Sequence, residues 1–147
     1  MTTMSKDLFL ALLAMDSYNR GYDPHITLHA ITIGVASVVQ DSLKLNEDPN
    51  VPDRVDEAAG FYTISYDVSA VAGFESGDIV ISYRGTDSGN GVWNGWTTCL
   101  GYPGQSDLAT QFYLDVVADL QNAPGGQTGD VILTGHSLGG ALAGGMQ

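Results

Sequence analysis

Cysteine is almost absent from this sequence, which contains only Cys99. A single cysteine cannot form a disulfide within the chain, and it excludes C-x-x-C and cysteine-rich zinc motifs. We expect Cys99 to be a free thiol in a loop, because no neighbouring residue would activate it as a nucleophile. His25 and His29 lie four residues apart, but Pro24 and the β-branched residues around them favour loop and strand over a helical metal pair. The sequence therefore predicts neither a metal site nor a cofactor.

Basic residues are also scarce, with 5 lysines and arginines against 17 acidic residues and a formal net charge of −12. This charge disfavours nucleic acids and anionic membrane surfaces as partners. No apolar run is long enough to span a bilayer. The run over 8–15 follows Lys6, but Asp7 interrupts the basic start and no small-residue cleavage site follows, so we expect a mature helix rather than a signal peptide. The protein is then either cytoplasmic or secreted without an N-terminal signal peptide.

A chain of 147 residues with 44% hydrophobic residues is long enough for a single domain with a core, over residues 1–147. Ser5 is placed to cap a helix over about 6–18. Four apolar residues of this helix fall on one face at helical spacing: Leu8, Ala11, Leu12 and Met15.

Three later segments have the composition or alternation of strands, over 31–39, 61–68 and 79–83. The last two are expected to pair through a hairpin or a short meander. Ser106 is placed to cap a helix with a broad apolar stripe, which ends at 124–126 and is expected to face the core. The order of strand, helix and strand around this helix predicts a parallel βαβ unit.

The most informative stretch begins with a short apolar run over 131–133, which predicts a buried strand. Gly135, Ser137 and Gly139 follow as G-x-S-x-G, and small residues then indicate the start of a helix. In that context the motif is typical of a nucleophile elbow, which holds the serine in a strained conformation and exposes its Oγ. The alternative is a glycine-rich turn that only allows a helix to pack closely on a strand.

A second candidate site follows the strand over 79–83, at Arg84-Gly85-Thr86-Asp87. Acyl transfer generates an oxyanion, which requires preorganised hydrogen-bond donors from two different loops. In an enzyme with a nucleophile elbow, one donor is the N–H of the residue after the nucleophile, here Leu138, and the other follows an earlier strand. Thr86 is suited to the second role through its N–H and its hydroxyl. The alternative is an ordinary turn at the end of a strand.

Residues 88–105 form a glycine-rich segment that also carries Trp93 and Trp96. Large apolar side chains on such a segment beside an active site are typical of a lid or of a flap that contacts a lipid–water interface. The alternative is a loop whose tryptophans pack on the body of the protein.

Three parts of the sequence together resemble the class 3 lipases, an α/β-hydrolase family that includes fungal triacylglycerol lipases and bacterial relatives. These parts are residues 79–86, the Asn94-Gly95-Trp96 tripeptide and residues 134–143, and the resemblance covers about residues 60–147. It implies an α/β fold of α/β-hydrolase type, with a mostly parallel sheet and flanking helices.

The resemblance also implies hydrolysis of lipid or small acyl esters. Ser137 falls on the position of the family's nucleophile. Thr86 and Leu138 fall on its two oxyanion-hole positions. Residues 88–105 fall where the family carries its lid, and a lipid–water interface is then an expected partner.

The triad of this fold follows the order Ser, Asp, His along the chain, so both partners of Ser137 are expected beyond residue 147. The sequence is therefore expected to be the N-terminal portion of a longer enzyme, with a sheet that is incomplete at the C-terminus. We expect it to be inactive alone, because His136 is adjacent to Ser137 and a serine without a base is a weak nucleophile.

Two other classes of function stay open. In the first class, the chain is a non-catalytic binding module that docks a partner or the missing C-terminal portion of the same enzyme. In the other, the same elbow serves a thioesterase, an acyltransferase or a peptidase.

Overall fold

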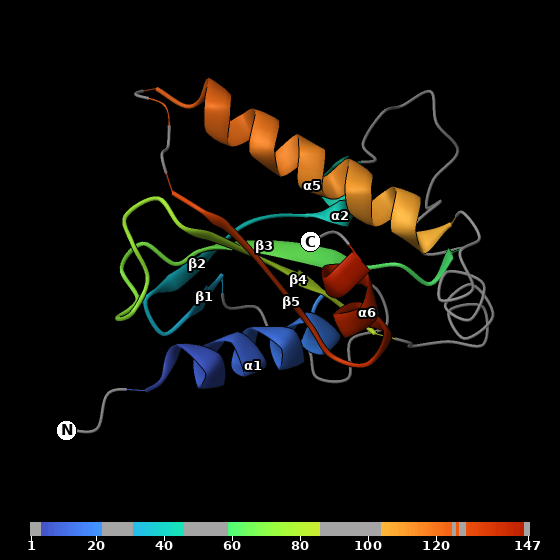
Figure 1. The fold of residues 1–147 in the computed structure, drawn as a ribbon, viewed down its shortest axis with the longest axis horizontal. Coiled ribbons are helices and arrows are strands. Elements are labelled where there is room, and N and C mark those ends of the chain that lie inside the picture. Colours follow the sequence, from blue (N-terminus) through green and yellow to red (C-terminus); the bar gives the residue numbers. More distant parts are fainter. Residues whose placement is uncertain are drawn as a thin grey trace.

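The computed structural model describes residues 4–21, 31–45, 59–85, 104–124, 126 and 129–145. In chain order the elements are helix α1 (Lys6–Asp16), the 3₁₀ helix η1 (Ser17–Asn19), strands β1 (Thr32–Ile33) and β2 (Ala36–Asp41), the short helix α2 (Ser42–Leu45), strands β3 (Thr63–Asp67) and β4 (Ile79–Tyr83), helix α5 (Gln105–Asn122), strand β5 (Val131–Gly135) and helix α6 (Leu138–Gly145). The fold is a mixed α/β arrangement (Figure 1). In the described part of the chain, no helix is both long and apolar enough to cross a membrane.

The strands form a five-stranded sheet in the order β1-β2-β3-β4-β5. The pairings from β1 to β4 are antiparallel, and β4 pairs with β5 in parallel, as the predicted βαβ unit requires. The predicted α/β class is confirmed, but the prediction of a mostly parallel sheet is wrong for the residues that the structure describes. The connections agree with this outcome, because residues 34–35 join β1 to β2 in a tight turn, and residues 68–78 join β3 to β4 without a helix. A parallel pair needs a long crossover such as the one that contains α5.

Helices cover both faces of the sheet (Figure 1). Helix α1 packs on β4 and β5 from one side, and α5 and α6 lie together on the other. One core, beneath α1, includes Leu13, Ile64, Tyr66 and Val80. The other core, beneath α5 and α6, includes Ile81, Tyr83, Phe112 and Leu142. Because alternate side chains of β3 and β4 enter opposite cores, nearly every residue of these two strands is buried.

The apolar face that the spacing indicates on α1 is exposed rather than buried. All four of its members are exposed, and the three large ones are Leu8 at 53%, Leu12 at 41% and Met15 at 56%. Phe9 and Leu13 are buried instead, and Phe9 packs edge-on against Phe74 with ring centroids 6.0 Å apart. Apolar residues occupy most of the circumference of α1, so their spacing alone does not identify the side that faces the core. The predicted core-facing stripe of α5 is confirmed, because Phe112 and Val116 are buried.

The two predicted serine caps have different outcomes. The side chain of Ser5 caps α1 by accepting a hydrogen bond of 3.2 Å from a backbone N–H in the first turn. Helix α5 instead begins at Gln105, with Gly104 at the N-cap position, so Ser106 lies inside the first turn and the prediction is wrong. Gln105 explains the earlier start, because its side chain is buried and its amide donates a hydrogen bond of 2.7 Å to the carbonyl of Ala59.

Candidate active site

The G-x-S-x-G motif forms a sharp turn between β5 and α6. Strand β5 ends at Gly135 and α6 begins at Leu138, so only His136 and Ser137 connect them. Ser137 has a φ of 57°, in the left-handed region, and no other non-glycine residue with a positive φ occurs among those that the structure describes. This conformation costs an L-residue about 1–2 kcal/mol, because Cβ approaches the backbone. The exposed Ser137 therefore has the strained geometry that is typical of a nucleophile elbow.

Gly135 and Gly139 allow β5, α6 and β4 to approach one another closely. A Cβ on Gly135 would overlap the backbone of Gly139, and a Cβ on Gly139 would overlap the carbonyl group of Tyr83. Gly144, towards the other end of α6, has open space at the same position. Close packing alone would explain the two motif glycines, but it does not explain a left-handed serine between them.

The first turn of α6 presents a backbone donor beside Ser137. The N–H of Gly139 donates to the carbonyl of His136, and the N–H of Gly140 donates to the carbonyl of Ser137, both at 3.0 Å. The N–H of Leu138 makes no hydrogen bond to any residue in the described ranges. Because N–H groups at the start of a helix favour anions, the Leu138 N–H is suited to bind a developing oxyanion.

The segment that leaves β4 passes directly beside the elbow, since β4 and β5 pair in parallel and end side by side. A Cβ on Gly85 would lie 2.6 Å from the carbonyl oxygen of His136 and 3.3 Å from Cβ of Ser137. Gly85 is therefore packed against the elbow at a distance that no larger residue allows. Thr86, the predicted second donor, follows Gly85 in the chain but lies outside the described residues.

Tyr18, in η1, is a site residue that the sequence did not predict. Its hydroxyl oxygen accepts a hydrogen bond of 3.1 Å from the N–H of Gly85. The same hydroxyl lies 3.2 Å from Nδ1 of His136 and 3.5 Å from the carbonyl oxygen of His136. Tyr18 precedes Gly85 by 67 residues and His136 by 118 residues, so no local pattern could have predicted these contacts.

A buried polar network lies behind the end of β4. Arg84 is 2% exposed, its guanidinium lies 4.8 Å from the ring centre of Tyr62, and it donates a hydrogen bond of 3.2 Å to the carbonyl of Arg20. Arg20 forms an ion pair with Asp16, which also accepts a hydrogen bond of 2.6 Å from the hydroxyl of Tyr66. Burial and the hydrogen bond to Asp16 raise the pKa of Tyr66 above its usual value. The network joins the C-terminal end of α1 and η1 to the residue before Gly85.

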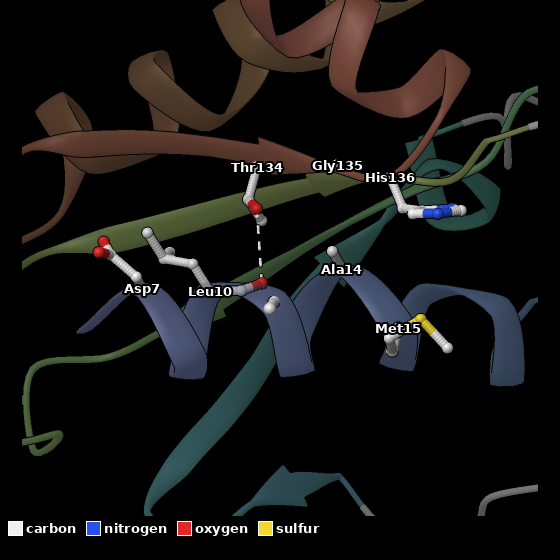
Figure 2. Close-up of a pocket in the computed structure, with 8 residues that line it drawn as sticks. Asp7, Leu10, Ala14, Met15, Thr134, Gly135 and His136 are labelled. Atoms are coloured by element: carbon white, nitrogen blue, oxygen red, sulfur yellow. Dashed lines mark hydrogen bonds between the residues drawn. The ribbon is translucent and has the colours of Figure 1, made fainter. Parts of the chain in front are cut away.

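A groove of about 370 Å³ lies between α1 and the end of β5 (Figure 2). Leu10, Ala14 and Met15 of α1 line one wall, and the other wall includes Thr134 and His136. The hydroxyl of Thr134 donates a hydrogen bond of 3.4 Å to the carbonyl of Leu10, which ties α1 to β5. The groove thus has apolar side chains along α1 and ends beside the residue that precedes Ser137.

Several predicted features lie outside the described residues, namely Thr86, His25, His29, Cys99 and most of the candidate lid over 88–105. The structure describes only Gly104 and Gln105 of the predicted lid range. Gln105 is the buried first residue of α5, so the predicted lid range ends where a core-facing helix begins. Within the described ranges, no group of three or more His, Cys, Asp or Glu residues is placed to hold a metal ion.

Comparisons of the chain with protein-family models, with curated proteins and with solved structures gave no match. The resemblance to class 3 lipases therefore stays a prediction from the residues that carry it. The geometry around Ser137 is then the main support for a function.

Proposed function

We propose that this protein is a carboxylic-ester hydrolase of lipase type, similar to the class 3 lipases, and that Ser137 is its nucleophile. The observation that supports this most strongly is the left-handed conformation of Ser137 between β5 and α6, with Gly85 packed beside it. A purely structural turn would favour glycine at this position, because serine there costs energy without contributing to the packing. On this proposal the fold is the N-terminal part of an α/β-hydrolase domain.

The proposed reaction begins when Oγ of Ser137 attacks the carbonyl carbon of an ester while a general base takes the hydroxyl proton. The carbonyl electron pair moves onto oxygen and forms a tetrahedral oxyanion. The carbonyl then re-forms, the bond to the alkoxy group breaks, and the base returns its proton to the leaving alcohol. Water attacks the acyl-enzyme by the same steps, which releases the carboxylic acid and restores Ser137.

The oxyanion is proposed to bind the N–H groups of Leu138 and Thr86. The available N–H of Leu138 at the start of α6 supports the first donor. The position of Gly85 against the elbow supports the second, because Thr86 is bonded directly to Gly85. Loss of one such donor typically lowers kcat by about 10²–10³-fold.

The general base is proposed to be a histidine, oriented by an aspartate, in a segment beyond Gln147. His136, the one histidine within the described ranges, lies next to Ser137 in the chain, and its ring contacts Tyr18. The exposure of β5 supports an additional segment beside it: all five residues of β5 are only partly buried, whereas all five residues of β4 are buried. In the described part of the chain, β5 is an edge strand, which a further strand could cover.

The proposed substrate is a lipid or a small acyl ester. The groove beside His136 has apolar side chains along α1, and this supports binding of an acyl chain near Ser137. Residues 88–105, with Trp93 and Trp96, are proposed to form a lid that contacts a lipid–water interface. The chemistry of a serine nucleophile requires neither a metal ion nor a cofactor.

Turnover of p-nitrophenyl acetate, butyrate and octanoate tests the proposal, in protein expressed from its complete reading frame. We expect hydrolysis that Ser137→Ala abolishes and that Ser76→Ala, an exposed serine in the turn before β4, leaves unchanged. A panel that adds acyl-thioesters and alcohol acceptors distinguishes an esterase from a thioesterase or an acyltransferase. Turnover that persists in Ser137→Ala would reject Ser137 as the nucleophile.

One observation favours a second candidate, a non-catalytic interaction module. Leu8, Leu12 and Met15 are exposed on α1, on the helix that also lines the groove. Exposed apolar side chains that cluster on one helix are typical of a surface that binds another protein segment. Absence of hydrolysis in the complete protein, together with concentration-dependent self-association that Leu12→Glu weakens, would favour this candidate.

A further inference from the structure

Three segments that are distant in the chain meet at the hydroxyl of Tyr18. These are η1, which carries Tyr18 itself, the segment after β4 at Gly85, and the elbow at His136. A phenolic hydroxyl has one proton to donate and lone pairs to accept. Its oxygen accepts from the N–H of Gly85 at 3.1 Å, and it also lies within hydrogen-bond distance of His136, 3.2 Å from Nδ1 and 3.5 Å from the carbonyl oxygen.

We infer that Tyr18 is a positioning residue, whose hydroxyl fixes Gly85 relative to the nucleophile elbow. The inference rests on the proposed function and assigns a role to a residue that is not part of the proposed triad or of the oxyanion hole. Tyr18 does not touch the reacting atoms. It acts on the residue before Ser137 and on the residue before Thr86, and thus on the separation of the two segments that supply oxyanion donors.

The packing at Gly85 shows why this separation needs a hydrogen bond to hold it. Gly85 approaches the elbow so closely that a Cβ would lie 2.6 Å from the carbonyl oxygen of His136. Glycine permits that approach but does not enforce it, because glycine has no side chain and is the most flexible residue of the backbone. The N–H of Gly85 is partly buried, and its partner is the Tyr18 hydroxyl, so the bond restrains the residue that has the most conformational freedom.

The residues on either side of Tyr18 in the chain are themselves fixed by polar contacts. Asp16, two residues earlier, is buried and forms an ion pair with Arg20, two residues later. The carbonyl of Arg20 accepts a hydrogen bond from Arg84, the residue before Gly85. The segment that carries Tyr18 is thus attached to the residues that follow β4 by a second hydrogen bond besides the hydroxyl contact, which favours a fixed position for Tyr18.

Tyr18→Phe tests the inference, because it keeps the ring and removes only the hydroxyl. The matched control is Tyr113→Phe, which makes the same change on α5, away from the elbow. In protein expressed from its complete reading frame, we expect Tyr18→Phe to lower kcat for p-nitrophenyl butyrate by about 10–100-fold with little change in KM. An interaction that acts only in the transition state affects kcat, and a misplaced catalytic group costs rate in this range. Tyr113→Phe should match the wild type.

A second measurement does not depend on activity. Amide hydrogen exchange by NMR should show that the N–H of Gly85 is protected in the wild-type chain and that Tyr18→Phe accelerates its exchange at least tenfold. The amides of β5 should exchange as in the wild type. This comparison separates a local effect at Gly85 from general destabilisation, and the wild-type measurement stands even if the variant fails to fold.

The outcomes separate the inference from the proposed function. If the wild-type protein hydrolyses esters through Ser137 and Tyr18→Phe has the same kcat, the positioning role is overturned and the proposed function stands. Rapid exchange of the Gly85 N–H in the wild type would also overturn it. If the wild-type protein neither hydrolyses esters nor reacts at Ser137, the proposed function is overturned, and the role of Tyr18 in the reaction is overturned with it.

Discussion

The carbonyl group of Tyr83, at the end of β4, fills the space in which a Cβ of Gly139 would lie. At this point strand β4 contacts the first turn of α6 through backbone atoms. Gly135 makes a similar backbone approach to Gly139 from β5. The position of the elbow thus depends on two residues that have no side chains.

Gly139→Ala should lower the free energy of unfolding by about 1–3 kcal/mol, because the added methyl must displace the backbone of β4 or α6. Gly144→Ala is the control in the same helix. It should be neutral or stabilising by up to about 1 kcal/mol, because nothing lies near its Cβ position and alanine favours helix. Urea unfolding measures both values. Equal effects of the two substitutions would contradict the packing described here.

Ser137→Gly and Ser137→Ala should have an unusual order of stability. In a helix interior, such as at the exposed Ala118, replacing alanine with glycine costs about 1 kcal/mol. At φ 57° the order should reverse, because alanine retains the left-handed penalty of about 1–2 kcal/mol and glycine does not. We expect Ser137→Gly to be more stable than Ser137→Ala by about 0.5–1 kcal/mol in urea unfolding. If the glycine variant were less stable than the alanine variant at both position 118 and position 137, Ser137 would not have the left-handed conformation.

Three buried tyrosines should make the protein sensitive to alkaline pH. Burial raises the pKa of Tyr62, Tyr66 and Tyr83 above the usual value. Above about pH 10 the unfolded chain loses these protons and the folded protein keeps them. The folded state then binds more protons, so stability is full below about pH 10 and falls above it by about 1.4 kcal/mol per pH unit for each tyrosine.

Tyrosinate absorbance and urea unfolding between about pH 9 and pH 11 check this expectation. The three buried side chains should ionise only as the protein unfolds, and Tyr66→Phe should reduce the slope of stability against pH. Ionisation of all seven tyrosines near pH 10 without unfolding would show that the burial described here is wrong.

Asp16→Asn should destabilise the protein by about 3 kcal/mol, since it removes a buried charge that pairs with Arg20 and accepts from Tyr66. Asp115→Asn is the control, because Asp115 contacts only Gln111 at the surface of α5 among the hydrogen bonds in the described ranges. Its effect should stay below about 0.5 kcal/mol. Thermal and urea unfolding of the two variants measure the difference. Comparable losses would contradict the structural role of the network behind Gly85.

The elbow could be predicted from the sequence because its pattern is local. The apolar run before Gly135, the alternation of glycine with Ser137, and the small residues that follow each specify one step of strand, turn and helix. The cap at Ser5 and the core-facing stripe of α5 were predictable for the same reason. In each case the deciding residues lie within a few positions of one another.

Other features depend on contacts between distant segments, and these could not be predicted from local sequence patterns. Helical spacing placed Leu8 and Leu12 on one apolar face of α1. It could not show that Phe9 and Leu13 face the core instead, because that depends on where the sheet lies. Strands β1 to β3 pair in antiparallel fashion, which a family likeness at 79–86 and 134–143 does not indicate. Tyr18 contacts His136, which lies 118 residues later in the chain, and no periodic pattern of residues could predict that contact.

The most direct measurement of the central claim is peptide mapping by mass spectrometry after reaction with a fluorophosphonate. The protein should be expressed from its complete reading frame, and it should be labelled both folded and after heat unfolding. We expect one adduct, on Ser137, that forms only in the folded protein and disappears in Ser137→Ala. An adduct on any other residue, or none on the folded protein, would contradict the assignment of Ser137 as a nucleophile.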